Sequence, residues 1–267
     1  MRKLGIIAVA IGLIPAAGAQ YVQQPEELAK INVVEKIGDQ VPLALKFTDH
    51  DGNSVELRDY FSDGKPVVLT MAYYACPMLC TLVLNGLRDA LAPLSLVPNV
   101  DYRLVTVSIE EKETPLLASQ KRQAYLESFG RSEQEADWHF LVGSAENSRA
   151  LADAIGFEYY YDAAIEEWAH PSLVTMLTPS GKVARYLYGI SHESKDVQLA
   201  ILESKKGETK ITKPIERILL YCYRYDPDSK GYVLAAQNIM KAGGALTVLF
   251  LGLFLGTFWI RERRASA

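Results

Sequence analysis

The chain lacks an excess of positive charge. Its 267 residues contain 28 Lys and Arg against 32 Asp and Glu, a formal net charge of −4, and the two signs are interspersed. It also lacks internal repeats and low-complexity tracts. This balance excludes nucleic acid as a partner. The stretch from Tyr21 to about Met240 is long enough for one domain with a substantial core.

Charged residues are absent from Ala242 to Ile260, which approaches the roughly 20 residues that cross a bilayer core as a helix. This run predicts a transmembrane helix. Arg261, Arg263 and Arg264 follow it directly, whereas only Lys241 closely precedes it. By the positive-inside rule, the carboxyl terminus lies in the cytoplasm and the globular part lies outside the membrane.

The amino terminus has the pattern of an export signal. Arg2 and Lys3 precede the apolar stretch 4–13, and the small residues 17–19 form a cleavage site before Gln20. Export agrees with the orientation predicted from the other end of the chain. We therefore expect a periplasmic domain, where a cysteine pair can meet oxidants.

Two of the three cysteines, Cys76 and Cys80, follow the apolar run 67–73. Pro77 favours a helix that begins directly after Cys76, and this helix would place the two thiols one turn apart on one face. The pair permits a reversible disulfide, a mixed-disulfide exchange site, or a soft-metal site for Cu(I) or Zn. The spacing alone leaves these three chemistries open.

Apolar segments of strand length alternate with helical segments along the chain, which predicts an α/β sheet. The expected strands are 41–47, 67–73, 102–109, 138–141, 157–161, 173–177 and 183–188, and the expected helices after the cysteine motif are 115–129, 145–155 and 194–204 with Ser194 as the cap. A strand–motif–helix start and a hairpin–helix finish is the thioredoxin-like order.

Four segments together resemble the Sco/SenC family of membrane-anchored copper proteins. They are Thr48-Asp49-His50-Asp51-Gly52, Cys76-Pro77-Met78-Leu79-Cys80, Trp138-His139-Phe140-Leu141-Val142-Gly143, and His170 ahead of Thr178-Pro179-Ser180-Gly181-Lys182. The resemblance covers most of 41–204. Thr81 replaces the proline that commonly follows the second cysteine, and Ala169 replaces the aspartate that often precedes the histidine.

The resemblance implies a thioredoxin-like fold with an inserted β-hairpin, and a copper site made by Cys76, Cys80 and His170. Copper would be carried as Cu(I) or Cu(II). The implied function is a metallochaperone that delivers copper to the dinuclear copper site of cytochrome c oxidase, or reduces that site's cysteines. The alternative is a thiol-disulfide oxidoreductase, thioredoxin- or peroxiredoxin-like, that uses Cys76 and Cys80 without copper. We expect a monomer.

These inferences divide the chain into six parts. They are a signal peptide (1–19), an N-terminal extension (20–40), the thioredoxin-like copper-binding domain (41–210), a membrane-proximal segment (211–241), the transmembrane helix (242–260) and a cytoplasmic tail (261–267).

The remaining candidates are assigned structural roles. We expect His50 in a surface turn, His139 in or beside its strand, and Met78 packed against the core. The odd thiol, Cys222, is interpreted as a buried small residue, with an intermolecular bridge or a relay to the other cysteines as alternatives. The acidic pairs 110–111 and 166–167 are interpreted as solvated surface.

Overall fold

The computed structural model describes residues 33–76, 78–130, 137–206, 214–226 and 230–265. The predicted signal peptide (1–19) and Pro77 lie outside these residues.

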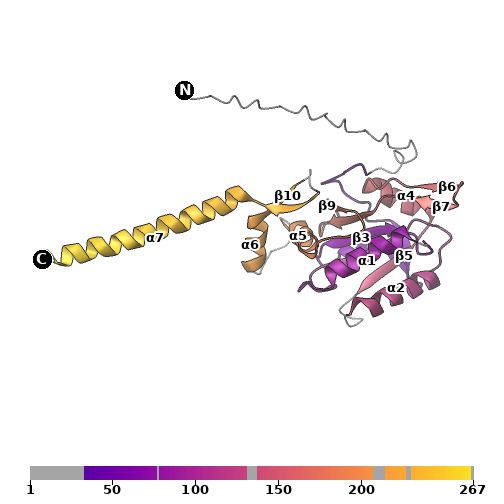
Figure 1. Ribbon diagram of the computed structural model, residues 1–267. Coiled ribbons are helices and arrows are strands. Elements are labelled where there is room, and N and C mark those ends of the chain that lie inside the picture. Colours follow the sequence, from indigo (N-terminus) through magenta and orange to yellow (C-terminus); the bar gives the residue numbers. More distant parts are fainter. Residues whose placement is uncertain (1–32, 77, 131–136, 207–213, 227–229, 266–267) are drawn as a thin grey trace, which may run out of the picture.

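A seven-stranded mixed sheet forms the centre of the molecule, in the order β2-β1-β5-β4-β3-β8-β9 (Figure 1). Its inner strands β3, β4 and β5 run parallel, and β8 pairs antiparallel with β3. All six residues of β3 are buried, as expected of a strand covered on both faces. The bounds are β1 Lys46–Asp49, β2 Ser54–Glu56, β3 Val67–Ala72, β4 Arg103–Ser108, β5 Trp138–Val142, β8 Leu173–Leu177 and β9 Val183–Tyr188.

Helices cover both faces of this sheet. One apolar cluster joins the sheet to α1 (Leu79–Leu91), α2 (Pro115–Phe129) and α5 (Ser194–Ser204). The other joins the opposite face to α4 (Ala145–Ala154) and the short 3-10 helix Leu57–Phe61. The alternation of side chains along each strand feeds both clusters, so neither face is left open to solvent.

The predicted α/β fold is confirmed, and α2, β8, β9 and α5 have the predicted bounds. Three local expectations are wrong. The strand expected at 41–47 is β1, which begins only at Lys46. Phe157 makes only an isolated bridge to Val33, and the strand in this region is β6 (Tyr160–Asp162). The N-cap of α5 is Glu193, and it makes no side-chain capping bond.

A hairpin separate from the main sheet is inserted between α4 and β8. Its strands β6 and β7 (Glu167–Ala169) pair antiparallel. The hairpin lies at one end of the molecule (Figure 1). Because β7 ends at Ala169, the hairpin fixes the position of the next residue, His170.

The carboxyl-terminal part consists of α6 (Pro214–Cys222), the hairpin β10–β11 (Tyr223–Asp226 and Gly231–Leu234) and α7 (Ala236–Ala265). Tyr232 bonds to Glu203 of α5 and thereby attaches this part to the domain. The stretch Ala236–Trp259 is long and apolar enough to cross a membrane. It begins six residues before the predicted 242, and α7 projects from the end of the molecule opposite to β6–β7 (Figure 1).

Candidate metal centre

The two motif cysteines lie where β3 gives way to α1. The strand ends at Ala72, the helix begins at Leu79 rather than directly after Cys76, and Cys80 occupies its first turn. The backbone N–H of Cys80 donates to the Cys76 sulfur at 3.3 Å. The helix terminus therefore supplies a donor to one sulfur while carrying the other.

His170 meets this pair from the β6–β7 hairpin. Its Nε2 atom lies 2.8 Å from the Sγ atom of Cys80. Only 7% of Cys76, 1% of Cys80 and 4% of His170 is exposed. The ring of His170 stacks on Phe157 and meets the edge of Tyr73. The structure thus brings the three predicted residues into one nearly dry pocket.

The hydrogen bonds of His170 define its tautomer. Its Nδ1 atom lies 3.0 Å from the carbonyl oxygen of Pro171, and because a carbonyl can only accept, Nδ1 carries the proton. Burial lowers the pKa of His170, which favours the neutral ring. With this tautomer the Nε2 lone pair faces the Cys80 sulfur, as a metal-binding imidazole nitrogen requires.

The two thiols have opposite electrostatic environments. Burial raises the pKa of Cys80 far above its ordinary value. Burial also acts to raise the pKa of Cys76, but hydrogen bonds from the backbone of Cys80 and Met78 and from the Tyr73 hydroxyl outweigh it and lower this pKa. Cys76 is thus the better thiolate of the pair.

The two thiols and the imidazole are donors that suit a soft metal, although their present separation does not form a complete ligand set. Within the described parts of the chain, no three His, Cys, Asp or Glu side chains already form a ligating group. Cys76 and Cys80 are free rather than disulfide-bonded. In the reduced protein, burial keeps the Cys80 thiol protonated. A Cu(I) ion would replace this proton, because thiolate and imidazole are donors that Cu(I) prefers.

One half-buried carboxylate beside the site, Glu113, was not identified from the sequence. Glu113 accepts the Ala75 backbone N–H at 2.8 Å and lies 2.6 Å from the Ser108 hydroxyl. A sequence signal exists in retrospect: Glu113 follows β4, the parallel neighbour of β3, and carboxyl ends of parallel strands meet at one edge. Thr81, which stands in place of the family's proline, donates to the Cys76 carbonyl at 3.5 Å.

Other expectations met mixed outcomes. His139 lies in β5 as predicted, but His50 is buried rather than at the surface, with 8% of it exposed. Met78 is 68% exposed, which contradicts core packing. Cys222 is half-buried at the end of α6, beside α7 and away from the β6–β7 end of the molecule (Figure 1).

Comparison with known families decides the assignment. The SCO1/SenC family model matches residues 38–204. The chain belongs to the SCO1/SenC family. The resemblance seen in the sequence is therefore confirmed, although no curated protein matches the chain by sequence.

Two solved structures share the fold of this SCO1/SenC chain at low identity, and a third is a weaker match. A putative electron transfer protein of Aquifex aeolicus VF5 is 23% identical over 67% of this chain and 99% of its own, with a TM-score of 0.57. A SCO1/SenC family lipoprotein of Bacillus anthracis str. Ames is 18% identical over 66% and 98%, with a TM-score of 0.50. Arabidopsis thaliana ScoI, solved with copper bound, is 19% identical over 63% and 98%, with a TM-score of 0.47.

Proposed function

We propose that this SCO1/SenC protein binds copper through Cys76, Cys80 and His170, and that it serves as an extracytoplasmic metallochaperone. The observation that carries the proposal is the 2.8 Å approach of His170 Nε2 to the Cys80 sulfur, with Cys76 beside it. Two thiolates and one imidazole form a low-coordinate set of soft donors that suits Cu(I). Membership of the family supports the same cargo.

The acceptor proposed is the dinuclear copper site of cytochrome c oxidase, on the grounds of family resemblance. Copper would pass by ligand exchange from this site to the acceptor's own ligands. The same thiols could instead reduce an acceptor disulfide. The Cys76 thiolate attacks one acceptor sulfur to form a mixed disulfide and releases the other acceptor thiol. Cys80 then attacks the Cys76 sulfur and releases the second acceptor thiol. Two electrons and two protons reach the acceptor, while Cys76 and Cys80 become a disulfide.

The proposed topology is a single span by α7, with the domain in the periplasm and the carboxyl terminus in the cytoplasm. The length and composition of 236–259 support the span, and the arginines from Arg261 onward support the orientation. Protease protection of a carboxyl-terminal tag in sealed cells would test the orientation.

The second candidate is a thiol-disulfide oxidoreductase for which copper is incidental. The lowered pKa of Cys76 next to a protonated Cys80 favours it, because an attacking thiolate and a buried resolving thiol are what exchange requires. This candidate does not require His170, whereas copper binding requires it as a ligand.

An anaerobic Cu(I) titration with a competing chelator separates the two. The full chain would be reduced in detergent micelles, and wild type compared with Cys76→Ser, Cys80→Ser and His170→Ala. Tight binding of one copper that weakens in all three variants supports the metallochaperone. Absent tight binding, or binding indifferent to His170, would move the pair to thiol-disulfide exchange.

A further inference from the structure

The loop between β4 and α2 contacts both segments that carry the candidate ligands. It begins at Ser108, the last residue of β4, and ends at Glu113, just before the N-cap Thr114 of α2. One contact reaches the cysteine motif and the other reaches the β6–β7 hairpin. These segments are far apart in the sequence.

The first contact holds the residues directly before Cys76. Glu113 accepts the Ala75 backbone N–H at 2.8 Å and also bonds to the backbone of Tyr74. Its second carboxylate oxygen lies 2.6 Å from the Ser108 hydroxyl. The carboxylate thus joins the end of β4 to the segment that follows β3, and it satisfies backbone donors that the strand no longer pairs.

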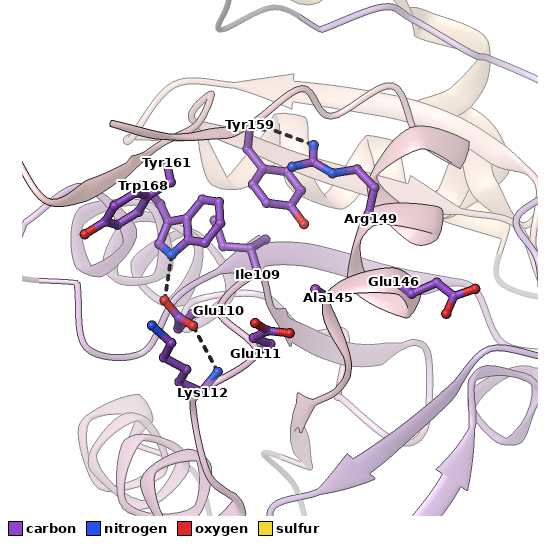
Figure 2. Close-up of a pocket in the computed structure, with 10 residues that line it drawn as sticks. All are labelled: Ile109, Glu110, Glu111, Lys112, Ala145, Glu146, Arg149, Tyr159, Tyr161 and Trp168. Atoms are coloured by element: carbon purple, nitrogen blue, oxygen red, sulfur yellow. Dashed lines mark hydrogen bonds between the residues drawn. The ribbon is translucent and has the colours of Figure 1, made fainter. Parts of the chain in front are cut away.

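The second contact holds the hairpin two residues before His170. The indole Nε1–H of Trp168 donates to Glu110 at 2.9 Å. Figure 2 shows this bond at the wall of a cavity of about 640 Å³, with Trp168 between the rings of Tyr159 and Tyr161. Tyr73 and Ala75 line an adjoining cavity that also includes Glu110 and Trp168. The Glu110–Trp168 bond therefore lies between the hairpin and the segment that precedes Cys76.

The loop is itself internally braced. The Ser108 hydroxyl accepts the Glu110 N–H at 3.0 Å, and Glu110 accepts the Lys112 N–H at 2.9 Å. The Glu113 N–H donates to the Glu110 carbonyl at 3.3 Å. A loop braced by these bonds can fix the distance between the two segments that it contacts, because both contacts are made from one short hydrogen-bonded turn.

We propose that Glu113 and the Glu110–Trp168 pair are positioning residues, which set the separation between the Cys76–Cys80 sulfurs and His170 before any metal arrives. This inference rests on the proposed function for its copper arm. Glu113 acts on the cysteines and Trp168 acts on the histidine, so the two contacts can be broken separately. Outer-shell partners of this kind typically change metal affinity by about 10- to 100-fold.

The experiment uses the full chain in micelles, reduced and metal-free, labelled with ¹⁵N. We expect the Ala75 amide of Glu113→Ala to exchange with solvent about 10-fold faster or more, since its acceptor is lost. Glu113→Gln keeps an acceptor and should restore slow exchange. Glu111→Ala is the matched control, because Glu111 lines a surface cavity together with Glu113, is exposed and makes no bond to the motif.

The hairpin arm uses Trp168→Phe, which keeps the ring and removes the donor, with Tyr161→Phe as its control. In Trp168→Phe, we expect the ¹⁵N shift of His170 Nε2 to move towards that of an unbonded ring nitrogen, while Ala75 exchange stays unchanged. The Cu(I) dissociation constant should rise about 10-fold in Glu113→Ala and in Trp168→Phe, and in neither control.

Wild-type behaviour of Ala75 in Glu113→Ala, or of His170 in Trp168→Phe, would overturn the inference, as would equal Cu(I) affinities. Failure of the proposed function gives a different result. If the wild type takes up no copper, the exchange and shift measurements on metal-free protein still decide whether these residues position the site.

Discussion

Histidines occupy two buried regions of this molecule with contrasting neighbours. In the first, His170 faces the Cys80 sulfur. In the second, which we call the histidine–aspartate cluster, His139 Nε2 lies 3.2 Å from an oxygen of Asp137, and the ring of His50 lies 5.9 Å from that of His139. The residue type is the same, so the neighbouring atoms set the chemistry. Sulfur makes the first region a soft site, and carboxylate makes the second a hard one.

The cluster also has its charges already paired. Arg103 lies 3.2 Å from Asp137. Burial opposes ionisation of Asp137, but its bond with His139 and the charges of His139 and of the nearby arginines outweigh it and lower its pKa. A carboxylate stabilised in this way supports the start of β5, whereas the Cys80 sulfur lies against the imidazole of His170 and the side chain of Cys76. This contrast gives four predictions.

The largest effect should appear when the Cu(I) affinity of a variant in the first region is compared with that of a variant in the second. Cys80→Ala should weaken Cu(I) binding by more than about 100-fold, beyond the usual cost of an outer-shell change, because it removes a ligand. His139→Asn should leave the Cu(I) dissociation constant unchanged. Chelator competition on both variants measures this. A comparable loss in His139→Asn would show that the cluster belongs to the metal site.

Copper loading should also release protons from the first region alone. At pH 7 the buried Cys80 is protonated and the neutral His170 has no proton to lose at Nε2, while Cys76 is the better thiolate. We expect between one and two protons per Cu(I), one from Cys80 and a fraction from Cys76. Calorimetry in buffers of different ionisation enthalpy counts them. Release of less than one proton would contradict a protonated Cys80.

Acid should destabilise the second region through His50. Burial, then the charge of Arg122, lowers the pKa of His50, so the folded state holds this ring neutral. The associated stability is complete above about pH 6.5, the ordinary pKa, and is lost as the pH falls towards the folded value. His50→Gln should remove up to one proton from the pH dependence of unfolding, at most about 1.4 kcal/mol per pH unit. Chemical denaturation at several pH values tests this, and an unchanged slope would contradict it.

The smallest effect should come from Met78, between the cysteines. Because 68% of this residue is exposed, Met78→Ser should change the free energy of unfolding by no more than about 0.5 kcal/mol. It should also leave Cu(I) affinity within about threefold of wild type. A larger loss of affinity would mean that the thioether joins the sulfur pair as a ligand.

The sequence predicted those parts of the fold that have local patterns. The bounds of α2, β8, β9 and α5 follow from apolar spacing and turn residues, and the cysteine motif follows from its own spacing. The β6–β7 strands have only three residues each and no clear alternation, so periodicity missed their bounds. The start of α7 was missed because the polar residues Gln237, Asn238 and Lys241 interrupt the apolar pattern there, whereas the helix itself continues through them.

The candidate site divides in the same way. Cys76, Cys80 and His170 could be named from the sequence, but Glu113 could not, because its bond to Ala75 joins residues of two different strand ends. The burial of His50 also depends on packing against β5, to which it is linked through the Phe140 N–H at 3.5 Å. Contacts between distant segments carry no local signature, and these contacts complete the site.

The direction of α7 has a consequence for where transfer can happen. This helix leaves the molecule from the end opposite to the β6–β7 hairpin, which lies beside the three donors (Figure 1). If α7 spans the membrane as proposed, the candidate donors lie at the end of the domain farthest from the lipid headgroups. In the proposed topology, an acceptor would have to offer its own ligands well clear of the bilayer.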